Sequence, residues 1–351
     1  MGTVLQYIRE NIQALKPYKS ARSEFTGRAE IFIDANENPY QLRYNRYPDA
    51  YQKKLKQLLS ERKGIAPEQI VLGNGSDELI DLLIRIFCVP GQDHILTYKP
   101  GFSMYLFAAQ INDVAVTEVP LEEGFYLDID KYIDSIQENT KVVFLCSPNN
   151  PTGTVVPQDD IIKLCSSTDR LVVVDEAYID FTEEKSSIAL LEKFDNLVVL
   201  QTFSKALGGA GIRIGMAYAS QELVAVLNAV RMPYNISQSS QDSALTLLID
   251  KSNHLARVSE IKEQKILLAE KLSSLSIVEE VIPSEANFLL TRFKNSDEVL
   301  SALRASGIIV RDRSQNFMCE NCLRISIGTP DENILLMQAL NKISTKEILS
   351  T

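Results

Sequence analysis

The chain has 351 residues, of which 45% are hydrophobic and 23% are charged, and its formal net charge is −10. This length predicts two domains, with a core large enough to enclose a cofactor. The negative charge argues against nucleic acid as a partner, and no apolar run approaches the ~18 residues that a membrane helix needs.

The N-terminal segment, MGTVLQYIRENIQALKPY, does not have the layout of a signal peptide, so we expect a cytoplasmic protein. The five cysteines are odd in number and scattered, which argues against a disulfide framework. Cys319 and Cys322 form a lone CxxC, and the chain has only two histidines. We therefore expect no metal site and a chemistry that rests on Lys, Tyr, Asp and Arg.

Short β-rich runs alternate with helical patterns through the first two thirds of the chain. Helices are predicted at residues 76–87 and 159–166, and the apolar residues of 76–87 follow helical spacing. Several strands are continuous apolar runs, which is typical of a sheet covered on both faces. We expect an α/β domain with a mainly parallel sheet and helices on both faces. Its strands are predicted at residues 69–73, 94–98, 114–119, 141–146, 171–174, 197–202 and 214–219.

The pattern changes after about residue 223. Long helical stretches run through residues 239–275, and an α+β segment follows them. We expect an N-terminal arm (1–35) that packs with the smaller domain, a large cofactor-binding domain (36–250) and a small C-terminal α+β domain (251–351). In the last part, strands are predicted at 287–292, 308–311 and 322–327, and a helix at 297–306.

Four predicted strands end in polar residues, at the edge where open α/β sheets bind ligands. The first runs through GNGSDE (73–78) into a helix. Small residues and a helix N-terminus suit an anion, although an ordinary capped helix gives the same pattern. The second runs into SPNNPTG (147–153), which on its own is ordinary turn chemistry.

The other two strands end in charged residues. Asp175 closes one of them, with Tyr178 three residues later, and a buried carboxylate needs a cationic or hydrogen-bonding partner. The other runs into Lys205 and a glycine-rich stretch that ends at Arg213. A lysine partly removed from water has a lowered pKa and is a better nucleophile, whereas an isolated lysine is more often solvated.

Taken together and in this order, GNGSDE, SPNNPTG, DEAY, TFSKALGGAGIR and CLRISIG resemble the fold-type I pyridoxal-phosphate (PLP) aminotransferases. LKPYKSAR (15–22), DANENPY (34–40), NRYPD (45–49) and GIIVRD (307–312) make the resemblance closest to the histidinol-phosphate aminotransferase group. The resemblance covers nearly the whole chain. It implies the fold-type I architecture, PLP as cofactor, and a step of histidine biosynthesis. In that step L-histidinol phosphate and 2-oxoglutarate give imidazole acetol phosphate and L-glutamate.

The resemblance also implies roles for individual cofactor-binding residues. Lys205 would carry PLP as a Schiff base and then move a proton at the substrate. Asp175 would pair with the ring nitrogen, and Tyr178 and Asn150 would bind the 3′-oxygen. The cofactor phosphate would be bound by Gly75, Ser76, Asp77, Thr202, Ser204 and Arg213.

Further roles concern the ring, the partner subunit and the substrate. Phe102 would stack on the cofactor ring at a position where the family often has Tyr. Tyr47 would reach the cofactor phosphate of a neighbouring subunit, which implies a homodimer with shared active sites. The substrate would contact Tyr18, Asn36, Arg311 and Arg324, with Arg22 as a weaker candidate.

Three other functions remain open from the sequence. Threonine-phosphate decarboxylases share this architecture and also bind a phosphate, and aminotransferases for aromatic or branched substrates share the cofactor residues. A non-catalytic PLP-binding or regulatory protein is the third alternative. The intact set of Lys205, Asp175, Tyr178 and Arg324 argues against it.

Overall fold

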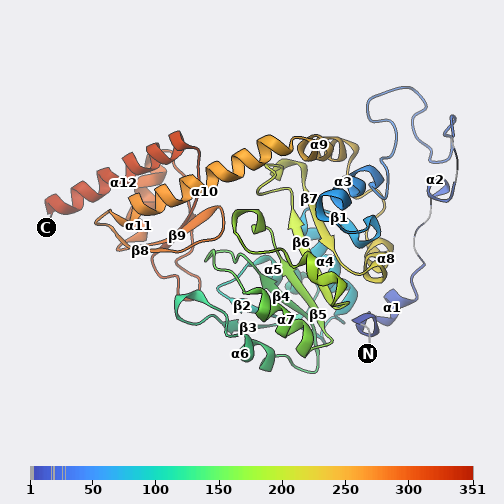
Figure 1. The fold of residues 1–351 in the computed structure, drawn as a ribbon, viewed down its shortest axis with the longest axis horizontal. Helices are drawn as coiled ribbons and strands as arrows, with labels where there is room; N and C mark the ends of the chain where they lie inside the picture. Colours follow the sequence, from blue (N-terminus) through green and yellow to red (C-terminus); the bar gives the residue numbers. More distant parts are fainter. Residues whose placement is uncertain (1–3, 17, 19, 26, 28, 351) are drawn as a thin grey trace.

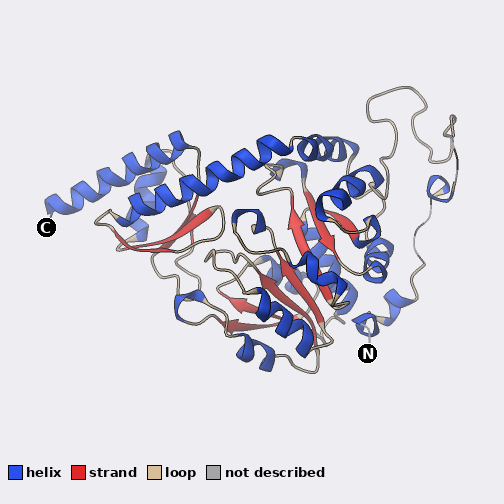
Figure 2. Ribbon diagram, viewed as in Figure 1, coloured by secondary structure: helices blue, strands red, loops and turns tan. Residues whose placement is uncertain are grey.

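A computed structural model of the chain describes residues 4–16, 18, 20–25, 27 and 29–350. It contains a larger sheet with helices on both sides and a smaller sheet at one end of the molecule (Figures 1 and 2). The larger sheet consists of β1 (Ile70–Asn74), β2 (His94–Lys99), β3 (Ala115–Pro120), β4 (Thr140–Cys146), β5 (Leu171–Asp175), β6 (Leu197–Thr202) and β7 (Ile214–Tyr218).

The strand order of the larger sheet is β1-β7-β6-β5-β4-β2-β3. Only β7 is antiparallel to its neighbours, β1 and β6, so the other six strands run in one direction. The predicted mainly parallel sheet is therefore confirmed, with one reversed strand that the sequence did not indicate. The carboxyl ends of the six strands share one edge of the sheet.

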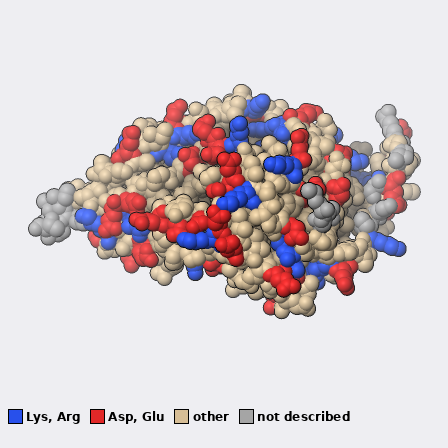
Figure 3. Space-filling view, turned by 60° about the horizontal axis from the view of Figure 1, so that its bottom comes forward, with Lys and Arg blue, Asp and Glu red and all other residues tan. Residues whose placement is uncertain are grey.

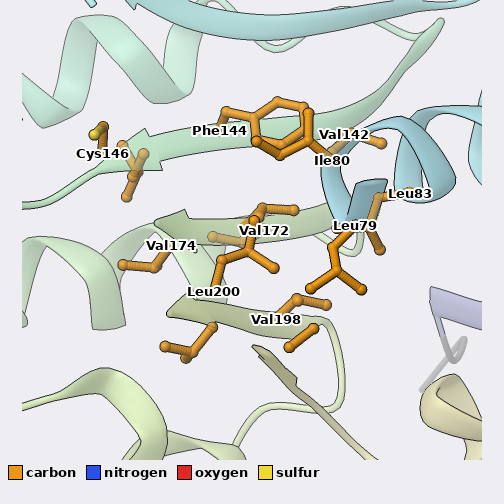
Figure 4. Packing of buried hydrophobic residues seen from close by; sticks show 14 of the residues in the cluster. Leu79, Ile80, Leu83, Val142, Phe144, Cys146, Val172, Val174, Val198 and Leu200 are labelled. Atoms are coloured by element: carbon orange, nitrogen blue, oxygen red, sulfur yellow. The ribbon is translucent and has the colours of Figure 1, made fainter. Parts of the chain in front are cut away.

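The strands are buried because helices cover both faces. The helices of the larger domain are α3 (Lys53–Lys63), α4 (Ser76–Phe87), α5 (Met104–Ile111), α6 (Ile129–Asp134), α7 (Gln158–Ser167), α8 (Gln221–Val230) and α9 (Gln238–Ile249). All residues of β5, β6 and β7 are buried, as expected for continuous apolar strands. Figure 4 shows Leu79 and Leu83 of α4 beside Val172 and Val198 of the central strands.

The smaller domain has its own core. Its sheet has the order β10-β11-β9-β8 and is antiparallel throughout. Of the predicted strand at 308–311, only Arg311 lies in a strand, which is the two-residue β10. The elements are α10 (Lys251–Ser273), β8 (Val278–Ile282), β9 (Phe288–Phe293), α11 (Ser296–Ala305), β10 (Arg311–Asp312), β11 (Cys322–Ser326) and α12 (Pro330–Ser350).

Helix α10 connects the two domains (Figure 1). Near its start, the His254 ring lies 3.1 Å from the carbonyl oxygen of Ala206 in the larger domain. Near its end, Leu268 and Leu272 pack in the core of the smaller domain. The proposed domain boundary after residue 250 thus falls at the start of a helix that belongs to both domains.

The N-terminal arm differs from the expectation that it packs with the smaller domain. Val4 and Ile8 belong to the core of the larger domain, and the Tyr7 hydroxyl donates a hydrogen bond to Asp169. These residues lie at the opposite end of the molecule from β8–β11 (Figure 1). The arm continues through α1 (Glu10–Gln13) and α2 (Ala21–Glu24). Among the described residues, no helix is both long enough and apolar enough to cross a membrane.

Candidate active site

A cavity of about 490 Å³ lies at the carboxyl-end edge of the larger sheet and extends to the smaller domain. Twelve of the site residues predicted from the sequence line this cavity. These are Ser76, Asp77, Phe102, Asn150, Asp175, Tyr178, Thr202, Ser204, Lys205, Arg213, Arg311 and Arg324. Four strand ends that looked ordinary one by one therefore meet in one place, as the parallel topology requires.

Asp175 is the last residue of β5 and is fully buried. The Tyr105 hydroxyl donates to its Oδ2 at 3.0 Å, and the Ala177 amide donates to its Oδ1 at 3.1 Å. Burial raises the pKa of Asp175 to about 6, while these two hydrogen bonds and Lys205 act in the opposite direction. A carboxylate held this way is suited to pair with a cationic group of a ligand.

Lys205 lies three residues beyond the end of β6 in a tight turn. Its carbonyl accepts a hydrogen bond from the Gly208 amide at 3.0 Å, and Gly208 has a φ of +69°. Burial lowers the pKa of Lys205, and nearby Arg324 lowers it further, whereas Asp175 raises it. The amine is therefore more often neutral, and more nucleophilic, than a lysine in water.

Two aromatic rings and an amide line the cavity near Lys205. The Lys205 ammonium lies 5.3 Å from the centre of the Tyr178 ring. Phe102 lines the cavity and meets Tyr105 edge to face, at 5.5 Å between ring centres. The Asn150 side-chain oxygen accepts a hydrogen bond from Arg324.

The start of α4 forms one end of the cavity and is suited to an anion. Gly75, at φ +80°, precedes the helix, and Ser76 and Asp77 line the cavity with Arg213. Arg213 lies 3.1 Å from Asp77, and a Cβ atom on Gly75 would lie 2.6 Å from the Arg213 guanidinium. Helix N–H groups and a guanidinium together make a phosphate site.

Three arginines of the smaller domain line the same cavity: Arg311, Arg313 and Arg324. Arg311 and Arg324 are directly opposite each other in the β10–β11 pair. Like charges in that position repel unless an anion lies between them. Arg313 was missed by the sequence reasoning. The sequence did contain a sign of its role: Arg313 is two residues after Arg311, and residues two apart in a strand lie on the same face.

Four predicted site residues do not line this cavity. Gly75 lies just behind it, in contact range of Arg213. Tyr47 and Asn36 line a separate cavity of about 450 Å³, where the Tyr47 ring stacks on Tyr234 at 4.6 Å. Tyr18 is exposed and lines a third, smaller cavity.

The loop that bears Tyr47 is held by a buried carboxylate. Glu37 accepts hydrogen bonds from Arg22, Arg46 and the Tyr47 amide, which lies 2.6 Å away. The hydrogen bond from Arg22 is the main reason that the pKa of Glu37 falls to about 2. Arg22 also forms an ion pair with Asp34. This weaker substrate candidate is therefore paired with nearby carboxylates and does not line the cavity that contains Lys205.

The cavity has the features that PLP needs. Asp175 can pair with a protonated ring nitrogen, Phe102 offers an aromatic face, and Lys205 offers an amine. The start of α4 and Arg213 can bind the phosphate. Among the described residues, no group of three or more His, Cys, Asp or Glu side chains is arranged to hold a metal ion.

Comparison with known proteins agrees with this geometry. The family of class I and II aminotransferases matches residues 30–340 of the chain. A histidinol-phosphate aminotransferase of Parabacteroides distasonis is 48% identical over 98% of this chain and 99% of its own length.

Two solved structures share the fold. One is a histidinol-phosphate aminotransferase from Clostridium acetobutylicum, with a TM-score of 0.79 and 24% identity. The match covers 86% of this chain and 91% of that one. The other is an L-threonine-O-3-phosphate decarboxylase from Porphyromonas gingivalis, with a TM-score of 0.73 and 25% identity, covering 85% and 90% of the two chains.

The buried charge of Asp175 predicts a pH-dependent stability. Its folded pKa of about 6 lies above the ~3.9 of a free Asp, so its contribution to stability is present below about pH 4 and is lost as the pH rises through 6. In protein prepared without cofactor, Asp175→Asn is expected to raise the free energy of unfolding at pH 8 by about 1–3 kcal/mol. The gain should shrink toward pH 5, as measured by urea unfolding.

The matched control is Asp195→Asn, because Asp195 is exposed and lies outside the cavity. This variant should show no pH-dependent difference from the wild type. An Asp175→Asn variant that is less stable than the wild type at pH 8 would contradict the assignment of an unpaired buried charge.

The close approach of Gly75 to Arg213 predicts a loss of cofactor affinity. Gly75→Ala places a methyl group against the guanidinium and is expected to raise the dissociation constant for PLP about tenfold, measured by equilibrium dialysis. Gly64→Ala is the control, because Gly64 has a similar φ of +72° and nothing within 4 Å of its added Cβ. Equal losses in both variants would mean that a general loss of stability, and not the contact with Arg213, explains the effect.

Proposed function

Because this chain belongs to the class I and II aminotransferases, together with the histidinol-phosphate aminotransferases, we propose that it transfers the amino group of L-histidinol phosphate to 2-oxoglutarate. The products are imidazole acetol phosphate and L-glutamate, in a step of histidine biosynthesis that uses PLP. The observation that carries the proposal is the position of Arg311 and Arg324. Both line the cavity that contains Lys205 and Asp175, so an anionic substrate is drawn to the reactive amine.

The residues around the cofactor have distinct tasks in this proposal. PLP, when bound, supplies an electron sink for the negative charge that develops at the substrate's α-carbon. Asp175 would keep a proton on the ring nitrogen, and the hydrogen bonds that it accepts from Tyr105 and Ala177 favour the carboxylate form that this requires. Tyr178 and Asn150 bind the 3′-oxygen.

Lys205 moves the proton during the reaction. Its lowered pKa would let the neutral amine take a proton from the substrate's α-carbon and hold it within the cavity. Its burial limits the access of water that would compete for that proton. The cofactor phosphate is held at the other end by Arg213 and by the groups at Gly75, Ser76, Asp77, Thr202 and Ser204.

One anion-binding site serves both substrates in turn. A planar guanidinium binds a phosphate or a carboxylate through two parallel hydrogen bonds. Arg324 is already oriented by Asn150 and by the Phe288 ring, whose centre lies 5.2 Å away. It can therefore receive the phosphate of the amino donor and, after the first product leaves, a carboxylate of 2-oxoglutarate.

A homodimer with shared active sites is part of the proposal. Tyr47 does not line the cavity with Lys205 in its own chain, and an ordered network around Glu37 holds its loop at the surface. In a dimer, Tyr47 would reach the cofactor phosphate of the partner subunit. Tyr18, in the N-terminal arm, and Asn36, which lines the same cavity as Tyr47, would likewise reach a substrate. We also propose a cytoplasmic location, since all five cysteines are free, as in reducing compartments.

The decarboxylase alternative is supported by the Porphyromonas gingivalis structure, which has the same fold. An enzyme of that kind also binds a phosphate, but its substrate carries a carboxylate and releases it as carbon dioxide. Product analysis separates the two reactions.

A coupled assay tests the reaction directly. With L-histidinol phosphate and 2-oxoglutarate, the purified protein is expected to form L-glutamate, and Lys205→Ala is expected to lower the rate at least about 10³-fold because the proton carrier is lost. Release of carbon dioxide from threonine phosphate, without glutamate formation from the histidinol phosphate pair, would sink the proposal.

A mixing experiment tests the shared site. Lys205→Ala and Tyr47→Ala chains are each expected to be nearly inactive at limiting PLP. In the mixed dimer, one site combines an intact Lys205 with an intact partner Tyr47, so co-expression should restore activity to roughly a quarter of the wild type if chains pair at random. If Tyr47 serves its own chain, mixing restores nothing. Co-expression of Lys205→Ala with Asp175→Asn is the control that should not recover.

A further inference from the structure

The Arg313 side chain is half-buried in the cavity and has no partner there. Its Nε atom is buried without a hydrogen-bond acceptor. In the part of the chain that the structure describes, no carboxylate lies within ion-pair distance of its guanidinium. By contrast, Arg292 and Arg257 each pair with a carboxylate. A buried guanidinium without an acceptor requires one from elsewhere.

The charges around Arg313 increase this requirement. Burial, together with the nearby charges of Arg324 and Arg311, lowers the pKa of Arg313 to about 10. Burial also lowers the pKa of Arg324, and Arg311 adds to this effect. Three like charges thus surround one space, whereas on the face of the molecule in Figure 3 acidic and basic side chains are interspersed. Only an anion with more than one negative charge balances such a group.

The backbone fixes Arg313 beside the other two arginines. Its amide donates to the Cys322 carbonyl at 2.9 Å, which continues the β10–β11 pairing one step past Asp312. Arg311 and Arg313 therefore project from the same face of one extended segment. The phosphate-binding end at Gly75 and Arg213 is a separate part of the cavity, built from the larger domain.

We propose that Arg313 is a specificity-determining residue that, with Arg311 and Arg324, binds the phosphate monoester of the amino donor and selects it over uncharged side chains. This inference rests on the proposed function. A phosphate monoester carries nearly two negative charges at neutral pH and has three acceptor oxygens, so it can engage three guanidiniums. A donor without the phosphate leaves all three arginines unpaired and is rejected.

Arg313→Gln tests the inference with two donors, L-histidinol phosphate and L-histidinol. The expected result is a fall of about 10–100-fold in kcat/KM for the phosphorylated donor, mainly through KM, because one charge-assisted contact is lost. For L-histidinol the change should stay below about threefold. Arg313→Lys should recover part of the loss. Arg257→Gln, with the same charge change at a site outside the cavity, should behave as the wild type.

A binding measurement separates this inference from the proposed function. Inorganic phosphate is titrated by calorimetry into PLP-saturated protein, whose cofactor phosphate site is filled, and Arg313→Gln is expected to weaken binding about tenfold. If the wild type turns over other amines but not L-histidinol phosphate, the proposed function fails, while an Arg313-dependent phosphate affinity still supports the anion site. Unchanged phosphate affinity in Arg313→Gln, or an equal loss for both donors, overturns the inference.

Discussion

The shared direction of six strands in the larger sheet determines where the central polar groups of the site lie. Their carboxyl ends bring Asp175, Lys205 and Asn150 to one edge, although 55 residues separate the first and last of them in sequence. Asp175 ends a fully buried strand, and Lys205 follows another one after three residues, so both are partly or fully removed from water. Each charge is therefore held at a fixed place with incomplete solvation, and the lowered pKa of Lys205 and the raised pKa of Asp175 both follow from that constraint.

Much of this arrangement could be predicted from the sequence, because continuous apolar runs and polar strand ends report directly on a covered parallel sheet. The reversed direction of β7 could not, since an apolar strand reads the same in both orientations. Tyr105 and Arg313 were also missed. The importance of Tyr105 comes from a hydrogen bond to a residue 70 positions away, which leaves no local pattern. Arg313 has a local signal in its spacing of two from Arg311, but its missing hydrogen-bond acceptor is visible only in the structure. The contacts of the arm with the larger domain depend on Val4 and Ile8. Two apolar residues do not indicate which of the two domains they pack against, so this contact could not be predicted from the sequence.

Arg311, Arg313 and Arg324 belong to the smaller domain and Lys205 belongs to the larger one, so the cavity depends on how the domains meet. The loop at residues 149–153 makes that junction. The Gly153 carbonyl accepts a hydrogen bond from the Glu285 amide at 2.8 Å, and a Cβ on Gly153 would lie 2.2 Å from the Ser284 hydroxyl. Asn150 in the same loop bonds Arg324. One turn therefore lines the cavity and contacts both Arg324 and the smaller domain, so a motif that on its own is ordinary turn chemistry joins the two domains.

The uncompensated charges that line the cavity have a consequence for the abundance of the protein in the cell. Ligands that bind only the folded chain stabilise it in proportion to the logarithm of their concentration, and the gain is largest where they neutralise a buried charge. Asp175 at one side of the cavity is such a charge, and Arg313 and Arg324 at the other side are half-buried. Chains that have not acquired cofactor are opened more often and are degraded sooner by proteases. The supply of cofactor therefore affects the lifetime of the polypeptide as well as the number of active sites. Newly made chains that bind cofactor first are degraded more slowly than those that do not.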